Sequence, residues 1–148
     1  MVKTFVRVRS IKDIVIFVFL AIVGCTLTAL PVGEAANIAG FFILISALIL
    51  ALVLKSGYKD IDTNEKYIKK ERYFQQAMHT SVLAAISSKP DSVDLTEEDK
   101  GNALRMDIYY SKSTGKAYLQ LFEYVPYTYQ PCSKMYEYGI SNVTKLIK

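Results

Sequence analysis

The chain has 148 residues, enough for one average domain, and its charged residues are distributed unevenly. Residues 14–54 carry Glu34 as their only charged side chain, whereas from Lys55 onward 14 Lys and Arg accompany 12 Asp and Glu, a net charge of +2 (14 − 12). This balance argues against a nucleic-acid-binding module, which would concentrate basic residues on one domain. With two Cys and one His in the whole chain, a zinc site of the usual Cys/His type is excluded, and we expect no cofactor.

The first twelve residues form a basic segment that contains Lys3, Arg7, Arg9 and Lys12. Cations directly before an apolar stretch are typical of the cytoplasmic flank of a membrane span. We therefore expect residues 1–12 to lie in the cytoplasm and to contact anionic lipid headgroups.

Two apolar stretches, about 14–32 and 35–54, follow this segment. A helix needs about 20 residues to cross the hydrocarbon core of a bilayer. Each stretch has that length and is apolar on all sides, unlike a core helix of a soluble protein, which keeps a polar face. The short link Pro31–Glu34 then predicts a tight transmembrane hairpin over residues 13–54.

The positions of the cations predict the orientation of this hairpin. Lys and Arg precede the first span, Lys55 and Lys59 follow the second, and the link contains neither residue type. The positive-inside rule therefore predicts a two-pass protein with both termini in the cytoplasm. Because the chain shows no organelle signal, we expect the membrane to be a bacterial inner membrane.

Small residues recur at helical spacing in both spans, where they allow helix backbones to approach closely. The helix-packing candidates are Ala21, Gly24, Thr28, Ala36, Gly40, Ala47 and Ala51. They fit packing within one hairpin or an interface between copies of the chain. Neither span contains Asp, Glu, Lys, Arg or His, which argues against a coupled transporter and leaves a pore open.

The string Ile22–Cys25 resembles the lipobox of bacterial lipoproteins, which would make Cys25 a lipid-bearing N-terminus. The residues after Cys25 remain apolar through Leu30, whereas an exported lipoprotein continues into a polar linker. The first stretch is also longer than the 7–15-residue core typical of a signal peptide. The uncleaved hairpin is therefore the favoured interpretation.

Residues 55–148 are predicted to form a small cytoplasmic α+β domain. Asp62 and Glu65 are spaced like the start of a capped helix, and apolar residues then recur at helical spacing, which predicts a long amphipathic helix to about Ser87. The following acidic stretch, 91–102, is predicted to be a solvated linker.

The rest of this domain carries β-strand patterns. Apolar and polar residues alternate over 104–110 and 117–125 on either side of a Gly-containing turn, which predicts an antiparallel hairpin. Two prolines bracket 127–130, so this segment is extended and is not a central strand. Residues 135–138 are expected to form a third strand, and a short helix over 142–147 ends the chain.

Tyrosines gather in this last part of the sequence. A small sheet has one core face, so we expect some of the rings to meet a partner or a membrane, where tyrosine is enriched. The partner-binding candidates are Tyr124, Tyr127, Tyr129, Tyr136 and Tyr138. Packing of the same rings within the sheet is the alternative.

Residues with catalytic potential are sparse. His79, the one histidine, has no nucleophile or carboxylate at helical spacing, and Cys132 has only Lys134 nearby to lower the pKa of its thiol. We therefore expect a non-enzymatic, membrane-anchored interaction or accessory module that presents a tyrosine-rich domain to a partner protein. The alternative is a homo-oligomeric pore-forming or membrane-permeabilising protein with a cytoplasmic regulatory domain.

Overall fold

A computed structural model describes residues 3–148, which fall into two compact units. One unit is Val6–Lys59, and the other combines residues 3–5 with Asp60–Lys148. Two strands, β1 (Phe5–Val8) and β2 (Gly57–Asp60), lie before and after the apolar helices and pair with each other. We describe each unit by itself.

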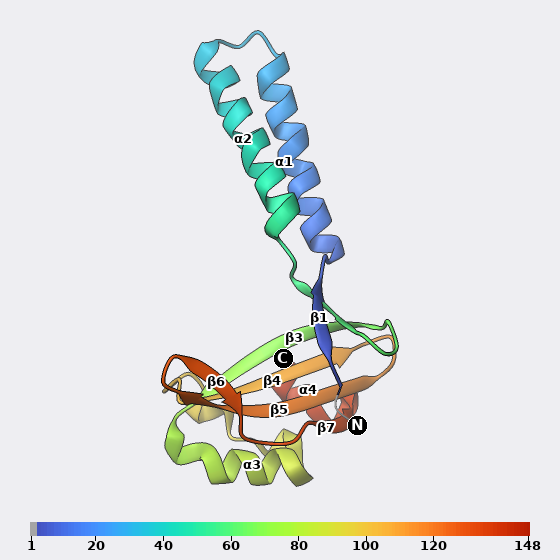
Figure 1. Cartoon of the computed structure of the whole chain (residues 1–148), viewed down its shortest axis with the longest axis vertical. Helices are drawn as coiled ribbons and strands as arrows, with labels where there is room; N and C mark the ends of the chain where they lie inside the picture. Colours follow the sequence, from blue (N-terminus) through green and yellow to red (C-terminus); the bar gives the residue numbers. More distant parts are fainter. Residues whose placement is uncertain (1–2) are drawn as a thin grey trace. The chain divides into compact units, whose positions relative to one another are not determined.

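The first unit is dominated by two long apolar helices, α1 (Ile11–Ala29) and α2 (Glu34–Val53), which pack side by side (Figure 1). Each helix begins and ends within three residues of its predicted span. The helix α1 starts earlier than expected because Ser10 and Asp13 form a capping box, in which each side chain accepts a hydrogen bond from the backbone N–H of the other. The spacing of Ser10 and Asp13 is visible in the sequence, but the predicted span began only after Asp13, the last charged residue before the apolar stretch.

The two helices approach most closely at Gly24 and Gly40. A Cβ atom on Gly40 would lie 2.6 Å from Thr28 Oγ1 and 2.8 Å from the Thr28 backbone nitrogen. A Cβ on Gly24 would lie 2.8 Å from Leu44 Cγ. Glycine at both positions therefore allows the backbones of α1 and α2 to touch.

The other predicted helix-packing residues line the same contact to different degrees. Ala47 is buried, whereas Ala21, Ala36 and Ala51 are half-buried and Thr28 lies at the edge with its hydroxyl donating to the Gly24 carbonyl (2.8 Å). The small residues of both spans thus serve packing within one hairpin. An additional interface between copies stays a prediction.

The second unit is built on an antiparallel sheet of β3 (Lys66–Phe74), β4 (Leu104–Ser111) and β5 (Lys116–Val125). Two short strands, β6 (Thr128–Pro131) and β7 (Tyr136–Gly139), pair with opposite halves of β5. The predicted hairpin and third strand are therefore confirmed, and the segment between the two prolines forms a strand at the sheet's edge.

One face of this sheet carries the hydrophobic core. Met106 and Ile108 of β4 and Leu119 and Leu121 of β5 are fully buried and pack against the helices. The helices are α3 (His79–Ser88) and the C-terminal α4 (Thr144–Ile147). Short 3-10 turns precede α3 (Gln76–Met78), follow it (Pro90–Ser92 and Leu95–Glu97) and precede α4 (Ile140–Val143). Both helices lie on the same side of the sheet (Figure 1). The predicted final helix is thus split, since its first turn is 3-10.

The predicted long helix from Asp62 to Ser87 is wrong over its first half. The string after Asp60 is a hairpin turn: the Asp60 carboxylate accepts from Thr63 Oγ1 (2.7 Å), and Asn64 has a φ of 60°. Residues 66–74 then form β3, because every residue from Ile68 to Phe74 pairs with β4. This long-range pairing outweighs a helical pattern that charged residues made ambiguous.

Substitution of Gly40 by Ala should destabilise the helical hairpin. The added methyl group would overlap the Thr28 backbone, and overpacking of this kind costs about 1–3 kcal/mol. We expect a lower midpoint of thermal unfolding for the detergent-solubilised protein. The matched control, Ala39→Val, changes an exposed neighbour on the same helix and should leave the midpoint unchanged; equal midpoints for both variants would contradict the contact.

Candidate functional site on the face opposite the helices

The face of the sheet opposite α3 and α4 is polar and aromatic, and we call it the polar face. The strand register places Glu71 of β3, Asp107 of β4 and Gln120 of β5 side by side across it. The polar face comprises Tyr67, Lys69, Glu71, Tyr73, Arg105, Asp107, Tyr109, Tyr118, Gln120, Phe122, Tyr124 and Tyr129. It carries much of the unit's aromatic surface together with a connected group of ion pairs.

The centre of the polar face is an ionic cluster around Asp107, which is only 2% exposed. Lys69 Nζ and Arg105 Nε each lie 2.8 Å from its carboxylate oxygens. Burial raises the pKa of Asp107, and the two cations oppose that effect. Lys69 also pairs with Glu71, whose second oxygen accepts a hydrogen bond from Tyr73 Oη at 2.6 Å. The two cations and two carboxylates of the cluster therefore balance one another in charge.

At one end of the polar face, the N-terminal segment covers an aromatic cluster. The Phe5 ring stacks on Tyr109 with centroids 4.1 Å apart, and its centroid lies 5.1 Å from that of Tyr67 and 5.7 Å from that of Tyr118. Burial raises the pKa of Tyr67 to about 12.

Polar contacts fix the same N-terminal segment. Lys3 forms an ion pair with the fully buried Asp60, and the Thr4 carbonyl accepts from Ile61 N at 3.1 Å. The chain therefore leaves the sheet before α1 and re-enters it after α2 at adjacent positions.

At the other end, the polar face is open and aromatic. The Arg105 guanidinium lies 4.9 Å from the centroid of the Phe122 ring and 4.5 Å from that of the Tyr129 ring. The Tyr129 ring meets Tyr124 edge-on at 5.2 Å, and its hydroxyl donates to the Asn102 carbonyl at 2.7 Å. Stacking against aromatic rings holds Arg105 and lends the rings a fixed orientation.

Beyond these rings the sheet ends in a two-residue turn, Pro126–Tyr127, between β5 and β6. Tyr127 is 96% exposed and has a φ of 76°. A proline followed by a residue of positive φ matches a type II turn, in which glycine is the favoured residue at the second position. A bulky side chain at this φ is strained, and it makes almost no contact that could offset the strain.

The structure brings together three of the five predicted partner-binding tyrosines. Tyr124, Tyr127 and Tyr129 share one end of the sheet, and with Val125 and Pro126 we call this region the tyrosine tip. Tyr136 and Tyr138 lie on the helix-covered face, opposite Leu119 and Ala117 in the register. The Tyr138 hydroxyl donates to the Ile86 carbonyl at 2.8 Å, and both rings pack against the core.

Sequence reasoning missed Phe5, Lys69, Arg105 and Asp107 as members of a common site. The alternation in β4 placed Arg105 and Asp107 on the non-core side. Their partner Lys69 was assigned to a helix, so the cluster could not be assembled. The signal that could have indicated a buried ion pair is an aspartate at the centre of a strand whose other residues alternate regularly.

The two residues with nucleophilic or acid–base potential lie elsewhere. Cys132 is half-buried against the core, its backbone N–H donates to the Leu121 carbonyl (2.9 Å), and burial raises the pKa of its thiol. A raised pKa lowers the thiolate fraction and hence the reactivity. His79 begins α3 and is half-buried. Within residues 3–148, no group of three or more His, Cys, Asp or Glu side chains is placed to hold a metal ion.

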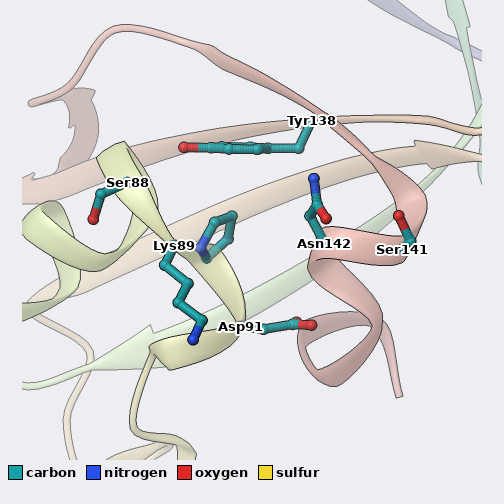
Figure 2. Close-up of a pocket in the computed structure, with 7 residues that line it drawn as sticks. Ser88, Lys89, Asp91, Tyr138, Ser141 and Asn142 are labelled. Atoms are coloured by element: carbon teal, nitrogen blue, oxygen red, sulfur yellow. The ribbon is translucent and has the colours of Figure 1, made fainter.

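A separate hollow of about 270 Å³ lies between the end of α3 and the last 3-10 turn (Figure 2). The Tyr138 ring lies along one wall. Asn142 and Pro90 also line the hollow. Asp91 at its rim accepts a hydrogen bond from Lys145 N (3.0 Å), and so serves the start of α4. We assign this hollow a structural role at the junction of the helices.

No protein-family model, no curated protein and no solved structure matches this chain. The functional assignment therefore rests on the chemistry of the residues themselves.

Substitution of Asp107 by Asn should strongly destabilise the sheet unit. The change leaves Lys69 and Arg105, whose side chains are only 10% and 21% exposed, without the charge that they share. Removal of one partner from a buried ion pair costs about 3–5 kcal/mol. Chemical denaturation followed by circular dichroism measures the effect, with the exposed Asp94→Asn as control. Equal stability of the two variants would show that the cluster contributes nothing.

Proposed function

We propose that this protein is a membrane-anchored, non-enzymatic interaction module, in which α1 and α2 span the bilayer and the tyrosine tip binds a partner protein. The same proposal places both termini in the cytoplasm and the hairpin in a bacterial inner membrane. The following observations support it.

The surfaces of α1 and α2 favour a membrane environment. The helices have 19 and 20 residues, and at about 1.5 Å per residue each reaches about 30 Å, the thickness of the hydrocarbon core. Within the most apolar 18-residue window of either helix, only 11% is buried, and Phe42 and Val53 are 64% and 73% exposed. The core helix of a soluble protein would be mostly buried, so lipid is the surrounding that best covers these side chains.

The anchoring of the N-terminal segment supports the predicted topology. Thr4 and Phe5 pack within the same unit as residues 60–148, which supports a topology with both ends of the helical hairpin on one side of the membrane. The cations that flank the hairpin, among them Arg9 and Lys55, favour the cytoplasm as that side.

Tyr127 is the single observation that carries the partner-binding assignment. A tyrosine in a strained backbone conformation, exposed almost completely, contributes nothing to the stability of its own domain. Such strain is typical of binding sites, and tyrosine is enriched at the centres of protein interfaces. The neighbouring Tyr124 is 51% exposed and extends the same surface.

The alternative, a homo-oligomeric pore, stays a prediction. It was based on small residues at helical spacing, and Gly24, Gly40 and Ala47 are occupied in contacts between α1 and α2 of one chain. A pore would need a second set of contacts on the outer surface of the hairpin.

Substitution of Tyr127 by Gly separates a binding role from a structural one. Glycine adopts the positive φ without strain, so we expect the isolated protein to gain about 1 kcal/mol in stability. The same variant should lose the partner that co-purifies with the wild-type chain in mild detergent. Thermal unfolding and the composition of the purified complex measure the two effects.

Lys112→Gly is the matched control. Lys112 is exposed in the turn between β4 and β5, at the end of β5 opposite the tyrosine tip. This variant should keep the partner at the wild-type ratio. A Tyr127→Gly protein that still carries the partner at that ratio would exclude the tyrosine tip as the binding surface.

A further inference from the structure

Five cations surround the end of the helical hairpin where the chain enters α1 and leaves α2. We call them the basic collar: Arg7, Arg9, Lys12, Lys55 and Lys59. All but Lys59 are exposed, and within residues 3–148 none of the five pairs with a carboxylate. Their charges are therefore available to an external anion.

Within Val6–Lys59, the carboxylate at this end of the hairpin is that of Asp13, and it is turned inward. Asp13 is 2% exposed, and its oxygens accept from Ser10 N (2.8 Å), Ser56 N (2.8 Å) and Ser56 Oγ (2.6 Å). These bonds tie the start of α1 to the residues after α2 and occupy the carboxylate with backbone and hydroxyl donors. The acid that could have paired with the collar thus closes the hairpin instead.

The opposite end of the hairpin has the reverse character, with Glu34 as its only charged residue. The collar, in addition, includes an aromatic neighbour, since the Arg7 guanidinium lies 6.0 Å from the centroid of the Tyr58 ring. Cations combined with tyrosine beside an apolar span are the residue types that meet phosphate groups at the surface of a bilayer.

We propose that the basic collar binds the phosphate groups of anionic phospholipids and gives the protein a preference for them over zwitterionic ones. The proposal rests on the membrane-spanning part of the proposed function and is independent of the tyrosine tip. It specifies a ligand class, a lipid phosphate that carries net negative charge. A phosphatidylcholine headgroup, whose phosphate is neutralised by its own choline, fits the collar less well.

The test uses the full chain in detergent, with phosphatidylglycerol and phosphatidylcholine of identical acyl chains added in turn. Native mass spectrometry gives the association constant of each lipid. The wild-type protein should prefer phosphatidylglycerol, and the triple variant Arg7→Gln, Arg9→Gln, Lys55→Gln should lose at least about fivefold of that preference. Equal association of both lipids with the wild-type protein would overturn the proposal.

Two control variants separate site from net charge. Lys100→Gln, Lys112→Gln, Lys134→Gln removes three exposed cations from the sheet unit and should keep the preference, as should the charge-conserving Arg7→Lys, Arg9→Lys, Lys55→Arg. A loss in the first control equal to that in the collar variant would show that the overall charge alone decides, and would contradict a site at the collar.

Two further arms identify the source of the phosphate and the level of a failure. Inorganic phosphate at millimolar concentration should not displace phosphatidylglycerol; displacement would assign the collar to a soluble anion. Extraction of cell membranes with alkaline carbonate reports whether the chain is integral. A chain that stays in the membrane but shows no lipid preference overturns the collar alone, whereas a chain that is extracted overturns the membrane anchor and the collar with it.

Discussion

The apolar surface of α1 and α2 is largely exposed, and it limits the environments in which this chain can fold. Side chains such as Phe42 are exposed, and only 11% of the most apolar 18-residue window of each helix is buried. In water, such a surface would drive aggregation, whereas in a bilayer it is satisfied without any further contact. In a bilayer, packing between the helices would come from close backbone approach rather than from the hydrophobic effect, and the glycines at Gly24 and Gly40 allow that approach.

Polar contacts connect the residues before α1 with those after α2. Asp13 joins the start of α1 to Ser56 after α2, and the Lys3–Asp60 ion pair and the Thr4–Ile61 hydrogen bond close the sheet unit at the same two points of the chain. The first contact closes the unit Val6–Lys59, and the other two close the sheet unit. The sheet keeps its helices on one face and uses the other for Phe5, the Asp107 cluster and the open tyrosine tip.

Local periodicity was sufficient to predict the parts of the fold whose partners are close in sequence. The two long helices, the β4–β5 hairpin and the edge position of β6 follow from apolar length, alternation and the two prolines. The strand β3 could not be predicted in this way. Both of its faces mix apolar and charged residues, and its partners are distant in sequence. Arg72, for example, lies on the core side and donates to the Leu146 carbonyl at 3.0 Å, 74 residues away.

The candidate site was predictable to a similar extent. The excess of tyrosines over the core positions indicated a ring-bearing surface, and Tyr124, Tyr127 and Tyr129 do share one end of the sheet. Tyr136 and Tyr138 could not be separated from them by sequence, since the face that a short strand presents depends on its register with β5. The strain at Tyr127 became visible only with the backbone φ.

Accessibility of the hairpin link from one side of an intact membrane reports whether α1 and α2 span it. The starting chain carries Cys25→Ser and Cys132→Ser. A single cysteine is then introduced as Val32→Cys in the link or as Lys112→Cys in the sheet unit. Cells whose outer membrane has been removed and whose inner membrane is intact are treated with a maleimide that cannot cross the membrane. If α1 and α2 span the membrane with both termini in the cytoplasm, Val32→Cys is labelled at once and Lys112→Cys is labelled only after the membrane is permeabilised. Labelling of both positions from the same side of the intact membrane would contradict a hairpin that spans it.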